Sequence, residues 1–198
     1  MASTYLTKTL GTPTNSYKGT ISFWYKKSQP VVSGGNQGLF GACNLGVTAN
    51  TYGFLNQYND SLYLYDNANS VILNTNRLFR DCNSFYHIVY AWDTTQATSS
   101  NRIKLYVNGV QETSFATANY PAQNSSLQIS TSGRTFGIGA FSTSTGGFSG
   151  FFDGAMSHFN YVDGTAYDAS AFGETDATTG EWKGKTSPSV TYGNNGFF

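Results

Sequence analysis

The chain has 198 residues, a net charge of zero and only 11% charged residues, against roughly 25% in an average soluble protein. Beyond Lys26 and Lys27 it has no basic cluster, so it lacks the electrostatic footprint of nucleic-acid binding and we expect no nucleic-acid partner. No run approaches the apolar length that spans a bilayer, and the N-terminus "MASTYLTKTLG" has no signal-peptide core. These features predict synthesis in a cytosol and no membrane insertion.

Short strand-like segments follow one another along the chain after an N-terminal segment at 1–18. Aromatic residues make up 16% of the sequence, which together with Thr, Val and Ile favours pleated sheets. Glycine, Asn, Asp and Ser clusters typical of turns separate the segments. The predicted strands cover residues 20–26, 38–43, 51–57, 61–66, 71–75, 85–93, 102–109, 135–141 and 151–164. This pattern predicts one all-β domain over 19–198, a two-sheet antiparallel jelly-roll sandwich.

Two of these segments carry a more specific prediction. The segment 85–93 is apolar on both faces, which indicates a strand in the middle of a sheet. Residues 102–107 alternate between apolar and polar side chains, so one face is buried and the other faces solvent or a partner. The dipeptide Asn108–Gly109 supplies the two positive φ angles of a type I′ turn, and Val110 begins the return strand.

Four further features fall outside the strand pattern. The residues 168–172 predict a single helical turn capped by Asp168. The Gly-rich stretch 137–154 predicts a mobile surface loop between two core strands. The apolar C-terminal pair, Phe197 and Phe198, predicts docking onto the domain. In a chain without an export signal, Cys43 and Cys82 are predicted to be reduced thiols, although pairing stays open.

Several stretches in this order resemble the laminin-G-like branch of the concanavalin A-like lectin/glucanase superfamily. They are "TISFWYKKS", "LYLYD", "RLFRD", "FYHIVYAWDTTQATSSNRIKLYVNGVQ" and "FFDGAMSHFNYVDGTAYDASAFGETDATTGEWKGK". The resemblance covers residues 20–198 and is closest to domains of marine bacteriophage virion proteins. It implies two antiparallel sheets, one of them concave, with rim loops that contact glycans or proteins. It implies the fold more firmly than the function, because this fold hosts lectins, hydrolases and spacers alike.

Hydrolases of this superfamily need two carboxylates about the scissile bond, usually in an ExDxxE pattern on one strand. The chain has three glutamates outside any such pattern: Glu112, Glu174 and Glu181. Asp153 and Asp163 are too far apart in sequence to be neighbours on one strand face. Neither His87 nor His158 stands in a nucleophile motif, and His87 is predicted to be a hydrogen-bonded structural residue. We therefore expect no enzyme; a degenerate glucanase that uses Glu112 is the weakest alternative.

Relatives of this fold often hold calcium where oxygen ligands converge at the rim. The possible ligands here are Asp60, Asp66, Asp153 and Asp163, with Asp60 and Asp153 as the preferred candidates. No DxDxDG-like cluster is present, and Asp at turns has its own reason to be there through local backbone hydrogen bonds. The prediction is therefore no cofactor, with Ca²⁺ as the alternative.

Sugar recognition combines aromatic faces, on which the ring stacks, with polar groups that bond to its hydroxyls. The segments 56–67 and 141–152 have this mixture. The predicted stacking residues are Tyr58, Tyr63, Tyr65, Phe148 and Phe151. The alternative is that strand aromatics such as Tyr63 and Tyr65 cover the outer face of the sheet or an intersubunit contact.

The favoured hypothesis is a non-enzymatic structural protein of a bacteriophage, displayed on the virion surface as a capsid decoration or as a tail or fibre component. Its expected partners are other virion proteins and further copies of itself, with a trimer as one option and residues 1–18 as an anchor. The alternative is a lectin-like module that binds glycans of the host surface. The two hypotheses are compatible, since a displayed domain can also serve attachment.

Overall fold

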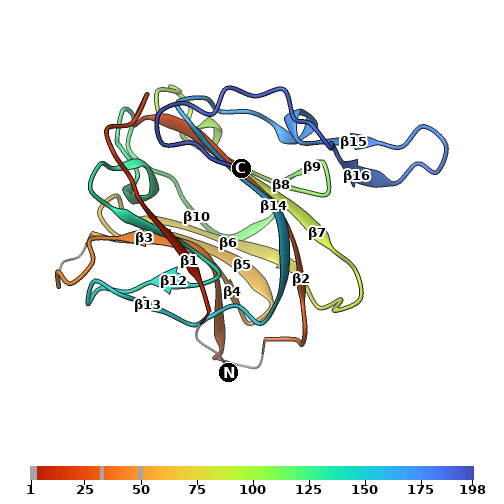
Figure 1. Ribbon diagram of the computed structural model, residues 1–198, viewed down its shortest axis with the longest axis horizontal. Helices are drawn as coiled ribbons and strands as arrows, with labels where there is room; N and C mark the ends of the chain where they lie inside the picture. Colours follow the sequence, from red (N-terminus) through yellow and green to blue (C-terminus); the bar gives the residue numbers. More distant parts are fainter. Residues whose placement is uncertain (1–3, 32–33, 49–50) are drawn as a thin grey trace.

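Two antiparallel sheets face each other across an aromatic and aliphatic core (Figure 1). The computed structural model describes residues 4–31, 34–48 and 51–198. The larger sheet has, in spatial order, β1 (Leu6–Thr9), β11 (Thr135–Ile138), β3 (Asn36–Cys43), β4 (Gly53–Tyr58), β5 (Ser61–Asp66), β6 (Val71–Leu78) and β10 (Phe115–Asn119). The smaller has β14 (Gly154–Asp163), β2 (Lys18–Lys27), β7 (Tyr86–Asp93), β8 (Ile103–Val107) and β9 (Val110–Glu112). The predicted all-β jelly-roll sandwich is confirmed.

Two small hairpins and three helical turns complete the fold of the described residues. One hairpin pairs β12 (Phe141–Ser142) with β13 (Phe148–Ser149), and the other pairs β15 (Gly173–Thr175) with β16 (Trp182–Gly184). The turns are 3-10 helices at Ser99–Asn101, Gln128–Ser130 and Ala169–Ala171. The last is the predicted turn, and the Asp168 side chain accepts from the Ser170 N–H at 2.9 Å. No helix of the described residues is long and apolar enough to cross a membrane.

Strand β7 is the central strand of the smaller sheet, as its two apolar faces predict. It pairs with β2 on one side and β8 on the other. Its inward side chains, Ile88, Tyr90 and Trp92, are buried in the main core. The β8–β9 hairpin also follows its prediction, because Asn108 and Gly109 have φ of 48° and 84°. These two left-handed positions form the turn between Val107 and Val110.

The outer face of the smaller sheet is covered by the chain's own C-terminal segment. A second apolar cluster joins Val89 and Val162 of the sheet to Ala169 and Phe172, with Tyr106 packed against it. The outer side of β8 was predicted to face solvent or a partner, and this holds only in part, because its side chains are half-buried. Its Tyr106 is half-buried under residues that follow β14 in the sequence.

Two segments belong to the sandwich more closely than the sequence predicts, and the C-terminal phenylalanines follow their prediction only in part. Strand β1 lies within the segment 1–18 and pairs with β11 at the edge of the larger sheet. The stretch 137–154 contains the β12–β13 hairpin, which lies against β3 and β4 rather than forming a plain loop. Phe197 docks as predicted, pairing with Tyr161 across the sheet edge. Phe198 does not, as it is 71% exposed.

Candidate functional site

The outer face of β4 and β5 carries a continuous set of aromatic rings. Because side chains alternate along a strand, Leu55 and Leu62 enter the core while their neighbours point outward. We call the outward set the tyrosine face: Phe54, Asn56, Tyr58, Tyr63 and Tyr65. The rings of Tyr58 and Tyr63 are 5.9 Å apart and those of Tyr63 and Tyr65 are 6.2 Å apart, the latter pair inclined by only 14°. The face therefore offers one nearly parallel ring pair, Tyr63 and Tyr65, whereas the Tyr58 ring is inclined to that of Tyr63 by 55°.

A wall formed by the β12–β13 hairpin turns part of this face into a pocket. The Phe141 ring lies 5.3 Å from the Phe54 ring. The resulting pocket has a volume of about 310 Å³ and is lined by Asn36, Phe54, Asn56, Tyr58, Tyr63 and Phe141. Its volume suits a small ligand or one unit of a longer one.

The pocket contains a buried acceptor that the protein leaves unpaired. Asn56 is 2% exposed, and its Nδ2 donates to Oδ1 of Asn36 at 2.6 Å. Its own Oδ1 has no hydrogen-bond partner among the described residues. An unpaired buried acceptor costs about 1–3 kcal/mol, and a donor from a ligand would recover this energy.

The hairpin reaches this position because β3 presents glycine beneath it. A Cβ on Gly38 would stand 1.9 Å from the Phe141 backbone nitrogen, and one on Gly41 would stand 2.5 Å from the Ser142 nitrogen. Real Cβ atoms do not approach so closely, so any larger residue would push the hairpin outward. The two glycines thus set the position of Phe141 over the tyrosine face.

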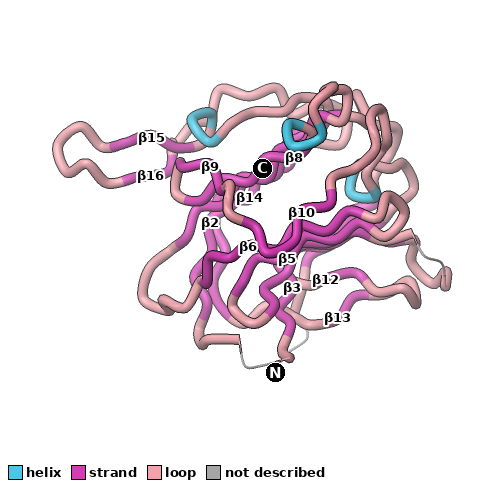
Figure 2. The backbone as a smooth tube through the Cα atoms, turned by 180° about the vertical axis from the view of Figure 1, so that it is seen from behind, coloured by secondary structure: helices cyan, strands magenta, loops and turns pink. Residues whose placement is uncertain are grey.

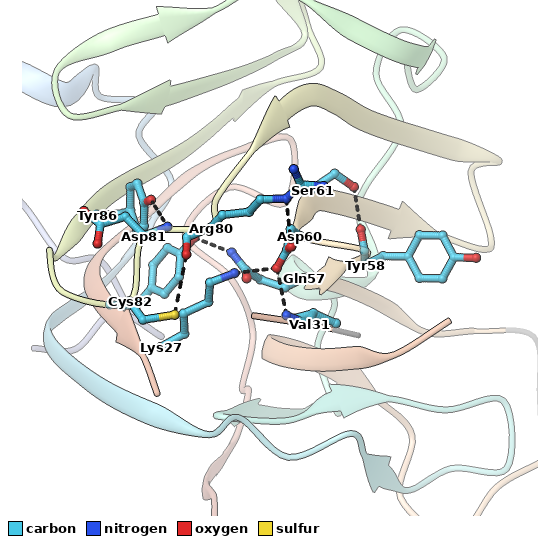
Figure 3. Close-up of polar contacts among 11 residues, drawn as sticks. Lys27, Val31, Gln57, Tyr58, Asp60, Ser61, Arg80, Asp81, Cys82 and Tyr86 are labelled. Carbon is cyan, nitrogen blue, oxygen red and sulfur yellow. Dashed lines mark hydrogen bonds and ion pairs between the residues drawn. The ribbon is translucent and has the colours of Figure 1, made fainter. Parts of the chain in front are cut away.

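Behind Tyr58, the β4–β5 turn is fastened by a buried ion pair (Figure 3). Asp60 accepts from Lys27 Nζ at 2.6 Å, from the Val31 N–H at 2.8 Å and from Arg80 Nε at 3.3 Å. Burial raises the pKa of this carboxyl, but the bonds from Lys27 and Val31 outweigh it and the net pKa lies below its usual value. Figure 3 shows the Tyr58 ring pointing away from this cluster.

The structure places the two preferred metal-ligand candidates in different roles. Both oxygens of Asp60 are engaged by the bonds just described. Asp153 is partly exposed, and its Oδ2 accepts from Gln29 Nε2 at 3.3 Å. Asp66 and Asp163 are buried and accept backbone N–H groups, from Gln128 and Thr14 respectively.

Across residues 4–31, 34–48 and 51–198, no group of three or more His, Cys, Asp or Glu side chains is placed to hold a metal ion. The absence of a cofactor, with Ca²⁺ as the alternative, stays a prediction.

The five predicted stacking residues fall into two separate groups. Tyr58, Tyr63 and Tyr65 lie together on the tyrosine face. Phe148 and Phe151 instead contact Tyr5, at ring distances of 5.3 and 5.5 Å. The sequence prediction missed Asn36 and Phe54 of the pocket, and it included Asn56 and Phe141 only as members of the segments 56–67 and 141–152. Strand alternation could have found Phe54 and Asn56, since they share a face with Tyr58.

The two side chains weighed for a catalytic role, Glu112 and His87, both make structural contacts. Glu112 is buried, pairs with Arg77 Nε at 2.8 Å and accepts the Ser114 N–H. His87 is fully buried and bonded through both ring nitrogens, as predicted for a structural residue. Burial lowers its pKa to about 4, so the ring is neutral near pH 7.

The sequence profile of the concanavalin A-like lectin/glucanases superfamily matches residues 2–170. The chain belongs to this superfamily. A search of curated protein sequences gave no match.

Solved structures with the same fold share little sequence. A heptameric SAP-like pentraxin from Limulus polyphemus is 18% identical, with a TM-score of 0.54 over 82% of this chain and 70% of the pentraxin. The CBM40 module of the Ruminococcus gnavus IT-sialidase is 13% identical, with a TM-score of 0.52 over 83% of this chain and 95% of the module. A candidate carbohydrate-binding protein from Bacteroides ovatus is 16% identical, with a TM-score of 0.55. This chain covers 42% of that protein and aligns over 83% of its own length. At these identities the likeness shows the fold.

Proposed function

We propose that this domain binds a neutral glycan on its tyrosine face. The observation that carries the proposal is the pocket of Tyr58, Tyr63, Phe54 and Phe141, in which the buried Asn56 Oδ1 lacks a partner. Pyranose rings present a C–H face that packs on aromatic rings and hydroxyls that bond to amides. Carbohydrate-binding modules among the structural neighbours support the same general kind of function.

The uncharged lining argues for a neutral sugar over an acidic one. All six lining residues are neutral. The cations of the adjoining cluster, Lys27 and Arg80, are both paired with Asp60. A carboxylate or sulfate brought into the pocket would lose water without gaining a counter-charge there.

A glycan array with matched variants tests the proposal. Tyr63→Ala removes the central ring and should lower binding to a neutral glycan about tenfold, since one aromatic contact contributes about 0.5–1.5 kcal/mol beyond its buried area. Tyr58→Ala should act in the same direction. Tyr17→Ala is the control, because Tyr17 is as exposed as Tyr58 (38% and 37%) but lies outside the pocket. If no neutral glycan binds the wild-type domain, or if all three variants bind equally, the proposal is wrong.

Display on a bacteriophage virion is a second proposal, and it rests on the sequence resemblance. An apolar surface lined by Leu6, Ile138, Phe159 and Phe198 supports it, because such a surface could contact other virion proteins or further copies of the chain. The segment 1–18 is the proposed anchor. Cryo-electron microscopy of intact particles tests it, and particles without this chain would contradict it.

A further inference from the structure

A second aromatic cleft lies on the smaller sheet, away from the tyrosine face. Trp24 of β2, Phe85 just before β7 and Trp182 of β16 line it, together with Ser157, His158 and Lys183. Its volume is about 380 Å³. We propose that this tryptophan cleft is a second binding site for a neutral sugar ring.

The two indoles are held in place by one buried histidine. Trp182 Nε1 donates to Nδ1 of His87 at 2.9 Å. The Trp24 ring stacks on the imidazole at 4.7 Å, with the planes inclined by 13°. The other imidazole nitrogen, Nε2, lies 2.9 Å from the Ser22 hydroxyl. Both indoles are therefore fixed before a ligand arrives, which lowers the entropy lost on binding.

The tautomer of His87 follows from these contacts. An indole N–H can only donate, so Nδ1 of His87 must accept and carries no proton. The ring proton is then on Nε2 and is donated to Ser22. A neutral imidazole in this tautomer is the form that holds Trp182 in the cleft.

The groups that remain open in the cleft suit a sugar. The indole N–H of Trp24 has no hydrogen-bond partner in the described part of the chain. Phe85 is 42% exposed and offers a ring to the cleft. An alkyl chain would bury the indole N–H without an acceptor, at a cost, whereas a sugar hydroxyl accepts from it while the ring stacks.

Charge in the cleft favours a neutral ligand. Lys183 is the one lysine or arginine among the described lining residues. It is paired with Asp176 at 2.8 Å and lies 3.8 Å from Glu174. An acidic sugar would compete with these two carboxylates for the ammonium group.

Part of the cleft lies outside the matched family region. The family profile covers residues 2–170, whereas Trp182 and Lys183 belong to the β15–β16 hairpin. Figure 2 shows this hairpin extending beyond the body of the sandwich. Two sites on different sheets would let one domain hold two glycan chains, or two points of one surface, and avidity would exceed the affinity of either site.

Nuclear magnetic resonance of the indole groups tests the site directly. The chain has three tryptophans, and Trp92 is fully buried in the core, so its indole signal is an internal reference. The probes are methyl glycosides of glucose, galactose, mannose, xylose and N-acetylglucosamine at about 50 mM, well above a millimolar Kd. At least one should shift the Trp24 and Trp182 signals in a saturable way and leave that of Trp92 in place.

Matched variants separate this site from the tyrosine face. Phe85→Ala should weaken the effect on the indole signals about threefold to tenfold, while Tyr63→Ala should leave it unchanged. If Phe85→Ala lowers the thermal stability of the domain, the titration of the wild-type domain with the neutral glycosides still tests the proposal. The proposal is overturned if no neutral glycoside shifts the two signals, if Trp92 shifts equally, or if sialic acid alone does so. Tyr63 lies outside the tryptophan cleft. The indole shifts in the Tyr63→Ala variant therefore test the cleft whether or not the tyrosine face binds sugar.

Discussion

Trp182 and His87 come from segments 95 positions apart in the sequence and are joined by a 2.9 Å hydrogen bond from the indole to the imidazole. The bond requires an unprotonated Nδ1, and burial holds the pKa of His87 at about 4 against an ordinary value of 6.5. Burial is the main cause of this depressed pKa, and the coulombic effect of His158 contributes in the same direction.

The first prediction concerns acid. Because the folded-state pKa of His87 is depressed, the unfolded chain takes up the proton first as the pH falls. The contribution of His87 to the free energy of unfolding is therefore complete above pH 6.5 and is lost progressively towards pH 4. The loss should reach about 3 kcal/mol. Urea unfolding of wild type and His87→Gln across this range measures it, and the difference between the two curves isolates His87 from the carboxylates. A constant difference would contradict the prediction.

Asp60 carries the second prediction. Asp60→Asn leaves the buried Lys27 ammonium without its counter-charge, which should lower the free energy of unfolding by about 3–5 kcal/mol. Arg80→Gln is the control, since the Arg80 side chain is mostly exposed and should cost less than about 1 kcal/mol. Replacing the pair together, as Lys27→Met with Asp60→Leu, should recover much of the loss. Chemical denaturation measures the free energy of unfolding of the wild type and of the three variants. Equal effects of the two single variants would argue against a buried pair.

The third prediction tests the hairpin wall. Gly41→Ala places a Cβ against the Ser142 backbone and should cost about 1–3 kcal/mol by overpacking. It should also weaken glycan binding, because Phe141 moves with Ser142. Gly147→Ala lies in the same hairpin, yet its Cβ would meet its nearest neighbour at 3.8 Å, so it should change neither property. Thermal unfolding and glycan titration of the two variants provide the comparison; indistinguishable results would mean that the close approach does not matter.

The two C-terminal phenylalanines give the fourth prediction. The Phe197 ring packs on Phe159 and Tyr161 at 6.2 and 5.6 Å, so Phe197→Ala should destabilise the domain by about 2–4 kcal/mol. Phe198 is largely exposed, and Phe198→Ala should cost less than about 0.5 kcal/mol. Urea unfolding distinguishes them. A larger loss of stability from Phe198→Ala than from Phe197→Ala would mean that Phe197 is not the residue that docks on the domain.

Much of the fold could be predicted because its strands carry strong local signals. The segment 61–66 coincides with β5, and the Asn108–Gly109 turn has the expected backbone. Strands β1, β10, β15 and β16 were missed because they are short or polar, and their pairing with distant strands decides their conformation. The cover over β8 was missed for a similar reason, since no local pattern shows that residues after 164 fold back over the sheet.

Only part of the candidate site could be predicted from the sequence. Tyr58, Tyr63 and Tyr65 share a strand periodicity, and their grouping follows from it. Phe148 and Phe151 could not be separated from them by sequence, because the position of the hairpin depends on contact with Gly38 and Gly41. The role of Asp60 also needed the structure, as its partner Lys27 lies 33 positions away.

The two thiols of the chain differ in accessibility. Cys43 is buried, and burial raises the pKa of its thiol, whereas Cys82 is partly exposed beside Arg80. A maleimide dye added briefly near neutral pH would therefore attach to Cys82 alone. The label would sit next to the residues that fasten the β4–β5 turn, and its emission could follow occupancy of the tyrosine face in real time without any engineered cysteine.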